Sequence, residues 1–204
     1  MKQFKMLSTV ALIFIFSSIN AQLSGGPFAQ LIIRGATLIN GNGAPPIGPV
    51  DVVVEKNIIK EVSVVGYPGV EIDPKKRPPL RDGGKEIDAH GMYLLPGFID
   101  MHGHIGGVAQ GADWDYVFNL WLAHGITTAR EPSGRGRDWA LDLKRKSEKN
   151  EIIAPRIIQY TGFGQGSKYE ISTTEQAREW VRENAKAGSD GIKFFGAAPE
   201  IMEA

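Results

Sequence analysis

Two histidines, His102 and His104, follow a short apolar run and are separated by a single glycine. Side chains two residues apart on a β-strand point to the same face, so an extended backbone would place both imidazoles and Asp100 on one face. Neutral imidazole is a common ligand of zinc and other transition metals. The spacing therefore predicts a metal site, with zinc as the expected ion, held by His102 and His104. The alternative is a strand end that carries two exposed histidines.

Lys193 lies in another apolar segment, between Ile192 and Phe194. On a strand it would share a face with Phe195 and lie opposite its two apolar neighbours. Because burial of an unpaired ammonium group costs free energy, a lysine in this setting requires a partner or an altered chemistry. Lys193 is therefore a candidate functional residue. The alternative is that its amine extends to the strand end or pairs with a carboxylate.

Four more side chains are candidates for roles around this metal site. Asp100 lies deeper than the histidines, where it would orient a ligand as a hydrogen-bond acceptor or bond within the floor of the fold. Arg130 and Glu131 follow a second expected strand and would face a substrate or form a loop ion pair. Tyr160 ends a third expected strand and would line the site or pack as an aromatic side chain.

Residues 28–72 have the pattern of a small β-sheet domain. β-Branched residues are concentrated in four segments, and no helical periodicity competes with them. These segments are 31–33, 37–39, 50–54 and 58–65. Lys56 and Asn57 are expected to form a hairpin turn, with the positive φ at Asn57. The basic segment 74–84 is interrupted by prolines and glycines, which predicts a solvated loop.

After residue 94, strands and helices are expected to alternate, because short apolar runs are separated by segments with helical periodicity. The expected order is strand 94–104, helix 114–124, strand 126–129, helix 137–149, strand 156–160, helix 174–187 and strand 191–195. Such a series forms a parallel sheet, in a doubly wound fold or a (β/α)₈ barrel. The barrel is favoured because the candidate ligands lie at the carboxyl ends of strands, where barrels place their sites.

Three positions near element ends are expected to have structural roles. His90 precedes the first strand of this series, and His124 ends its first helix, where a partial positive charge interacts favourably with the helix dipole. Thr173 or Thr174 is expected to cap the third helix.

Composition excludes several classes of protein. The 204 residues include 23 Lys and Arg and 23 Asp and Glu, so no basic surface for nucleic acid is expected. A hydrophobic content of 42% predicts a packed globular core. The chain has no cysteine, which leaves imidazole, carboxylate and lysine as its metal-binding groups.

The segment that ends at Ala21 has the pattern of a secretory signal peptide. Lys2 and Lys5 precede a mostly apolar run from Leu7 to Phe16, and Ala21 is a small residue at the expected cleavage site. The run is about half of the roughly 20 apolar residues that a membrane span requires. We therefore expect export to the periplasm or the extracellular space, without a stable membrane anchor.

Several segments, in order along the chain, resemble the amidohydrolase superfamily of metal-dependent hydrolases. The central segments are DAHG at 88–91 and LPGFIDMHGH at 95–104. The flanking ones are IRGATLING at 33–41 and DVVVEKNII at 51–59, which resemble strands of the family's N-terminal β-sandwich, and HGITTAR at 124–130, which resembles its second barrel strand. The HxH pair alone is weakly specific, whereas the ordered set is strongly specific and covers nearly everything after residue 28.

The resemblance implies a hydrolase with two zinc ions per full-length chain. In a subset of the family, including dipeptidase, prolidase-like and imidazolonepropionase-like members, the lysine that ends the fourth strand is carboxylated and bridges two metals. The segment GSDGIKF at 188–194 resembles that stretch, which assigns the bridging role to Lys193. The implied reaction is cleavage of an amide, peptide or cyclic amide C–N bond by metal-activated water, in a small-molecule or dipeptide-like substrate. A deaminase on the same scaffold is the alternative.

The resemblance also implies residues that would follow Ala204. These are two histidine ligands after the fifth and sixth strands and an aspartate after the eighth, which would act as the base. A complete barrel takes about 250 residues, so we expect the first half of an incomplete barrel here, and an inactive fragment. The expected parts are the signal peptide 1–21, a partial β-sandwich domain 22–94 and four β/α units at 95–204. The alternatives are a non-catalytic truncated product with weak metal binding, and a half-barrel that forms a homo-oligomer.

Overall fold

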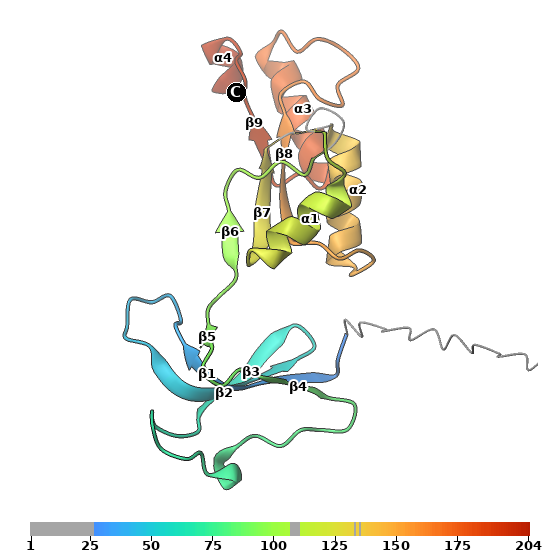
Figure 1. The fold of residues 1–204 in the computed structure, drawn as a ribbon. Helices are drawn as coiled ribbons and strands as arrows, with labels where there is room; N and C mark the ends of the chain where they lie inside the picture. Colours follow the sequence, from blue (N-terminus) through green and yellow to red (C-terminus); the bar gives the residue numbers. More distant parts are fainter. Residues whose placement is uncertain (1–26, 107–110, 133, 135) are drawn as a thin grey trace, which may run out of the picture. The chain divides into compact units, whose positions relative to one another are not determined.

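The computed structural model describes residues 27–106, 111–132, 134 and 136–204 (Figure 1). They divide into two compact units, the first made of 27–38 with Pro45–Leu94 and the second of Ile39–Ala44 with Leu95–Ala204. The expected signal peptide lies outside the described residues. Within the described ranges, the helices are too short or too polar to cross a membrane.

The first unit is built on one five-stranded sheet. Its strands are β1 (Gln30–Leu38), β2 (Ile47–Glu55), β3 (Ile58–Val64), β4 (Lys85–Asp88) and β5 (Tyr93–Leu94), with the 3₁₀ helix η1 at Pro74–Lys76. The order is β3-β2-β1-β4, and β5 also pairs with β1. A small buried core of Ala36, Val50, Val52 and Ala89 packs on it. The β-rich character is confirmed, while the second layer that a sandwich requires stays a prediction.

One local expectation for this unit was wrong. The hairpin between β2 and β3 does turn at Lys56 and Asn57, but the positive φ of 57° belongs to Lys56. The segment 74–84 is mostly exposed, as expected of a solvated loop, and one of its residues also anchors it to the sheet. Arg77 donates to both carboxylate oxygens of Asp51, at 2.9 Å each, and Asp51 is fully buried. A buried carboxylate requires such a partner, and this need anchors the loop to the sheet.

The second unit alternates strands and helices in the expected order. Its elements are β6 (Phe98–Asp100), α1 (Trp114–Ala123), β7 (Ile126–Pro132), α2 (Arg137–Glu148), β8 (Arg156–Gly162), α3 (Thr174–Ala187), β9 (Gly191–Lys193) and α4 (Pro199–Met202). The four strands form a parallel sheet in the order β6-β7-β8-β9 (Figure 1). The mixed α/β class is confirmed, and closure of this sheet into a barrel stays a prediction.

The two faces of this sheet have different surroundings. Ile157 of β8 is buried in a cluster with Phe118 of α1 and Leu143 of α2, so its face is covered by helices. Residues paired across neighbouring parallel strands point to the same face. The register pairs Glu131 with Gln159, two residues beyond Ile157, so both lie on the helix-covered face. Odd positions along β7 and β8 therefore face the helices, and even positions face the opposite side.

Local signals at the helix ends agree with the structure. Thr173 is the N-cap of α3, and its side chain accepts a hydrogen bond from the backbone N–H of Gln176 in a capping box. Gly188 ends α3 in the left-handed conformation, with φ of 107°. His124 is the C-cap of α1, and its Nδ1 lies 2.7 Å from the carbonyl oxygen of Leu120.

Candidate metal centre

His102 and His104 lie in the turn that follows β6, not on the strand itself. The strand ends at Asp100, before the expected end at His104. After Asp100 the backbone leaves the strand. Oδ1 of the Asp100 side chain accepts a hydrogen bond from the backbone N–H of His102 at 2.8 Å, so this N–H does not pair with β7. Gly103 then donates its N–H to the carbonyl oxygen of Arg130 on β7, at 3.0 Å. The turn is thus tied to the sheet at the carboxyl end of the strands.

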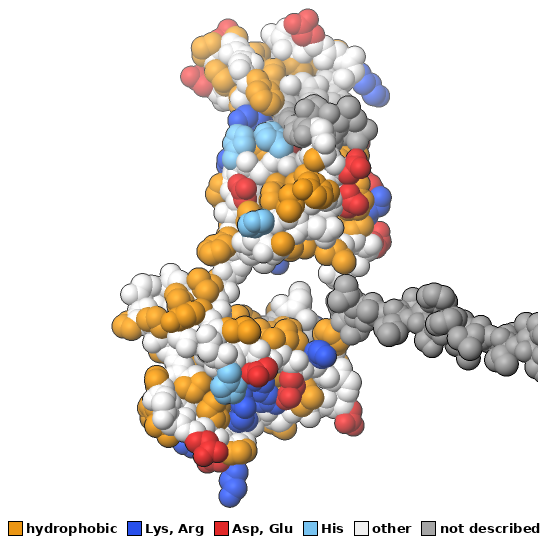
Figure 2. All heavy atoms as spheres, in the orientation of Figure 1, with side chains coloured by type: hydrophobic (Ala, Val, Ile, Leu, Met, Phe, Trp, Pro, Cys, Tyr) orange, Lys and Arg blue, Asp and Glu red, His pale blue; other side chains and the backbone are white. Residues whose placement is uncertain are grey.

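The two imidazoles nevertheless lie side by side. Their ring centres are 5.3 Å apart and the ring planes meet at 74°, and Figure 2 shows histidine side chains adjoining one another at the surface of the second unit. Two imidazoles on one tetrahedral zinc have ring centres about 5.2 Å apart, since each nitrogen lies about 2.0 Å from zinc and each ring centre about 1.2 Å further. The spacing of His102 and His104 therefore fits a shared divalent metal.

Glycine is required between the two histidines. A Cβ added at Gly103 would lie 2.8 Å from the ring of Trp121 on α1 and 3.3 Å from Oδ2 of Asp100. The histidine turn therefore packs closely on α1. Asp100 acts here on the backbone of the turn at the carboxyl end of the strand, which is neither of its two expected roles.

Glu131 ends up on the helix-covered face, close to one of the histidines. Its side chain is fully buried, and Oε1 accepts a hydrogen bond from the backbone N–H of Gly134. The same oxygen lies 3.8 Å from Nδ1 of His104. Direct contact between Glu131 and a substrate is disfavoured by this burial, and the contact with His104 was not foreseen.

Arg130 and Tyr160 lie on the opposite, open face of the two middle strands. The guanidinium carbon of Arg130 is 5.0 Å from the centre of the Tyr160 ring, within the range of a cation–π contact. Nε of Arg130 is buried without a hydrogen-bond partner among the described residues. The ring of Tyr160 also packs on Gly191, where an added Cβ would approach it to 2.7 Å. The charged guanidinium group of Arg130 is thus held near the carboxyl end of β7 by its contact with the Tyr160 ring.

Lys193 ends β9, at the edge of the sheet away from β6. It pairs with Gly162 in the register, which places it on the open face with Tyr160. Its Nζ lies 5.5 Å from the centre of the Phe195 ring, in agreement with the expected shared face. No carboxylate pairs with it in the part of the chain that the structure describes. Lys193 is half-buried, so its ammonium group retains access to solvent.

The donors do not by themselves complete a metal site. Among the described residues no three His, Cys, Asp or Glu side chains gather into a metal-binding group. The two histidines follow β6 and Lys193 ends β9, so the two candidate groups lie at opposite edges of the sheet, with β7 and β8 between them. A zinc site that performs catalysis uses three protein ligands and an open position, so the histidine pair is a partial donor set.

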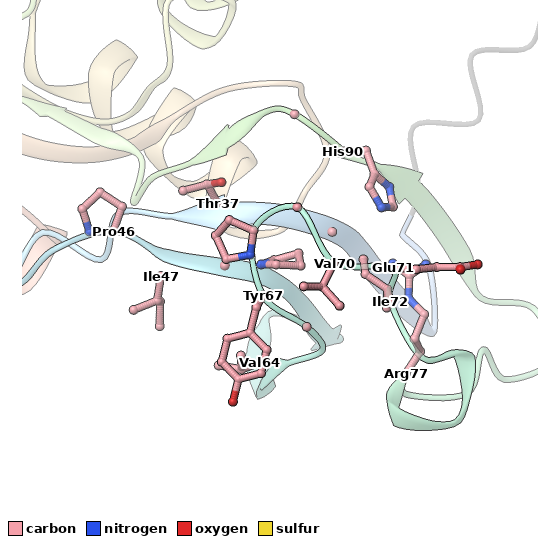
Figure 3. Close-up of a pocket in the computed structure, with 17 residues that line it drawn as sticks. Thr37, Pro46, Ile47, Val64, Tyr67, Val70, Glu71, Ile72, Arg77 and His90 are labelled. Atoms are coloured by element: carbon pink, nitrogen blue, oxygen red, sulfur yellow. The ribbon is translucent and has the colours of Figure 1, made fainter.

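A cavity of about 900 Å³ lies elsewhere, in the first unit (Figure 3). Its walls come from β1, the start of β2 and the loop after β3, and include Tyr67, Val70, Arg77 and His90. Arg77 is bound to Asp51, and Nδ1 of His90 lies 2.8 Å from Oδ1 of Asp88. The expected structural role of His90 stays a prediction. The chemistry-bearing residues belong to the second unit, so this cavity is not their site.

Comparison with known proteins supports the fold. No protein-family model matches the chain. A dihydroorotase from Thermoanaerobacter sp. (strain X514) is 34% identical over 76 residues, which is 37% of this chain and 14% of that protein. Among solved structures, a putative prolidase from Bifidobacterium longum matches 84% of this chain and 42% of its own, at 21% identity and a TM-score of 0.62. A prolidase complexed with N-methylphosphonate-L-proline matches 81% and 46%, at 20% identity and a TM-score of 0.60.

The chain spans less than half the length of these solved structures. The match covers both units, because it extends over more than four fifths of the chain. The fold expected from the histidine motif and its flanking segments agrees with these comparisons: this chain has the fold of solved prolidases and of a solved amidohydrolase, over part of their length.

Proposed function

We propose that the full-length protein is a metal-dependent hydrolase that cleaves C–N bonds in small amide, dipeptide-like or cyclic amide substrates. The observation that carries the proposal is the pair of imidazoles 5.3 Å apart at the carboxyl end of a parallel sheet. The solved structures with this fold include prolidases and a Xaa-Pro dipeptidase, which act on such bonds by name.

We assign the following roles to residues of this chain. His102 and His104 hold one divalent metal, which we take to be zinc. A metal bound there supplies Lewis-acid polarisation of a carbonyl and a water of lowered pKa. Arg130, held on Tyr160, faces the substrate from the middle of the sheet. Lys193 ends β9, and if its amine added CO₂ and lost a proton, the resulting carbamate would offer carboxylate oxygens to a second divalent metal.

We propose that the described residues bind one metal through His102 and His104. Two imidazoles leave such a metal short of the three protein ligands that a catalytic zinc site uses. The protein is proposed to act outside the cytoplasm, because the segment up to Ala21 has the pattern of a signal peptide.

Metal binding tests the proposal directly. Purified protein should bind zinc or cobalt, measured by competition with a chromophoric chelator, and His102→Ala or His104→Ala should weaken binding at least tenfold, because each removes one of two ligands. His124→Ala is the matched control, since it removes an exposed histidine of the same unit that lies at the end of α1. Equal affinity in all three variants would overturn the proposal.

A further inference from the structure

Glu131 is a buried acid with a fixed carboxylate. It lies near the end of β7, its side chain has no solvent exposure, and its register partner Gln159 is also fully buried. The backbone N–H of Gly134 donates to Oε1, which holds that oxygen in place. Burial of a carboxylate is costly unless it accepts strong hydrogen bonds, so its position is set by the surrounding structure.

The fixed oxygen faces one of the two histidines. Oε1 of Glu131 lies 3.8 Å from Nδ1 of His104, which is longer than a hydrogen bond by several tenths of an ångström. Gly134 lies beside both groups: an added Cβ there would be 2.7 Å from Oε1 of Glu131 and 3.8 Å from Nδ1 of His104. The absence of a side chain at Gly134 thus allows the carboxylate to approach the imidazole.

The direction of this contact matters for metal binding. A neutral imidazole carries one proton, and the nitrogen without it is the one that binds a metal. A carboxylate that accepts a hydrogen bond from Nδ1–H fixes the proton there, leaves the lone pair on Nε2 and holds the ring plane. Oxygens of Asp100 serve the backbone of the turn instead, through the N–H of His102.

We infer that Glu131 is a positioning residue that orients His104 for metal binding through a Glu131 Oε1···H–Nδ1 hydrogen bond. A small rotation of the imidazole closes the remaining gap when Nε2 binds a metal. The inference rests on the proposed function, because it assigns His104 as a ligand. It adds a role for Glu131 that the position of this residue after an expected strand did not reveal.

Zinc or cobalt affinity tests the role of Glu131 without any need for turnover. Glu131→Ala should weaken binding by about 10- to 100-fold, the loss typical when the partner of a ligand histidine is removed. Glu131→Gln keeps the volume and an acceptor oxygen but loses the charge, so its loss should be smaller. Glu151→Gln removes an exposed acid of the same unit and should bind like the unchanged protein.

A second readout reports the histidine itself. Two-dimensional ¹H–¹⁵N spectra of the zinc-bound protein should show His104 as the Nδ1–H tautomer, and Glu131→Ala should shift it towards a mixture. If Glu131→Ala does not fold, Gly134→Ala gives the same test, because its Cβ displaces the carboxylate without removing it. Unfolding of each variant in urea without metal shows which of them are folded.

The outcomes separate the two proposals. Weak binding in the Glu131 and His104 variants, with an altered tautomer in the former, supports both. Unchanged affinity and tautomer in Glu131→Ala, with weak binding in His104→Ala, overturns the positioning role and leaves the metal site standing. Unchanged affinity in His104→Ala overturns the metal site and, with it, the role of Glu131.

Discussion

Asp51 shows how one residue connects distant parts of the first unit. Its carboxylate is fully buried on β2 and accepts hydrogen bonds from Arg34 on β1, from Arg77 after η1 and from the backbone N–H of Gly35. Two guanidinium groups and one amide therefore share a single buried charge. This arrangement fixes the loop around Arg77 against β1 and β2, because the donors to Asp51 come from two segments that are separate in the sequence.

Replacement of Asp51 should destabilise the first unit strongly. Asp51→Asn leaves two guanidinium groups around a neutral amide, and breaking a buried ion pair in this way costs about 3 to 5 kcal/mol. We expect this loss in the free energy of unfolding, measured in urea. Asp82→Asn, at an exposed position in the same unit, should change it by less than about 0.5 kcal/mol. Equal stabilities of the two variants would contradict this account.

The Asp51 carboxylate should also make the free energy of unfolding depend on pH in the acidic range. Burial acts to raise the pKa of Asp51, but hydrogen bonds from Arg77, Arg34 and Gly35 outweigh it and hold the pKa below its ordinary value of 3.8. A lowered folded-state pKa contributes stability that is fully present above the unfolded-state pKa and is lost as the pH falls through the folded-state pKa. The free energy of unfolding should be measured from pH 6 down to about pH 2. It should fall less over this range in Asp51→Asn than in the unchanged protein.

The proximity of two candidate ligands was predictable, while their role as metal ligands stays a prediction. His102 and His104 were expected to lie together because their type and spacing are visible within one short stretch of sequence, and their rings do adjoin. The strand argument for their shared face was wrong in detail, since Asp100 ends β6 and the turn after it brings the rings together. The contact of Glu131 with His104 joins segments on either side of α1, and no local pattern reports such a contact.

At the scale of elements, local signals determined the helices and long-range pairing determined the short strands. The helices α1, α2 and α3 were predicted to within one residue, because apolar periodicity, caps and glycine stops are all local. The strands β4 and β5 were missed. β4 is exposed along its whole length, and both exist because they pair with β1, which precedes them by two intervening strands and a long loop.

The cap of α3 gives a test at this scale. Thr173 and Thr174 could both cap the helix from the sequence, and the structure assigns the role to Thr173, whose side chain accepts from the N–H of Gln176. Thr173→Ala should therefore lower the free energy of unfolding by about 1 kcal/mol. Thr174→Ala, inside the first turn, should be neutral or slightly stabilising because alanine is the better helix former. The opposite ranking in urea unfolding would contradict the assignment.

At the scale of the whole molecule, the composition and the order of the elements predicted the fold class, but they did not predict whether the second sheet closes into a barrel. An even charge balance, alternating strands and helices and the ordered motifs led to a fold that the solved relatives share. The four-stranded sheet has its two candidate metal-binding groups on opposite edges. Their approach would require the sheet to curve, and closure of a sheet follows from strand tilt and register across many strands, which a local sequence pattern does not report.

Export of the protein is a prediction of the N-terminal sequence. Lys2 and Lys5 precede a mostly apolar run, and Ala21 offers a small residue for cleavage before Gln22. In a bacterial host, the protein should be recovered outside the cytoplasm with Gln22 as its first residue, as read by N-terminal sequencing or intact mass. Ala21→Arg should block cleavage, because signal peptidase requires a small residue there, and the longer form should accumulate. An uncleaved protein that begins at Met1 in both cases and is retained in the cytoplasm would contradict the prediction of export.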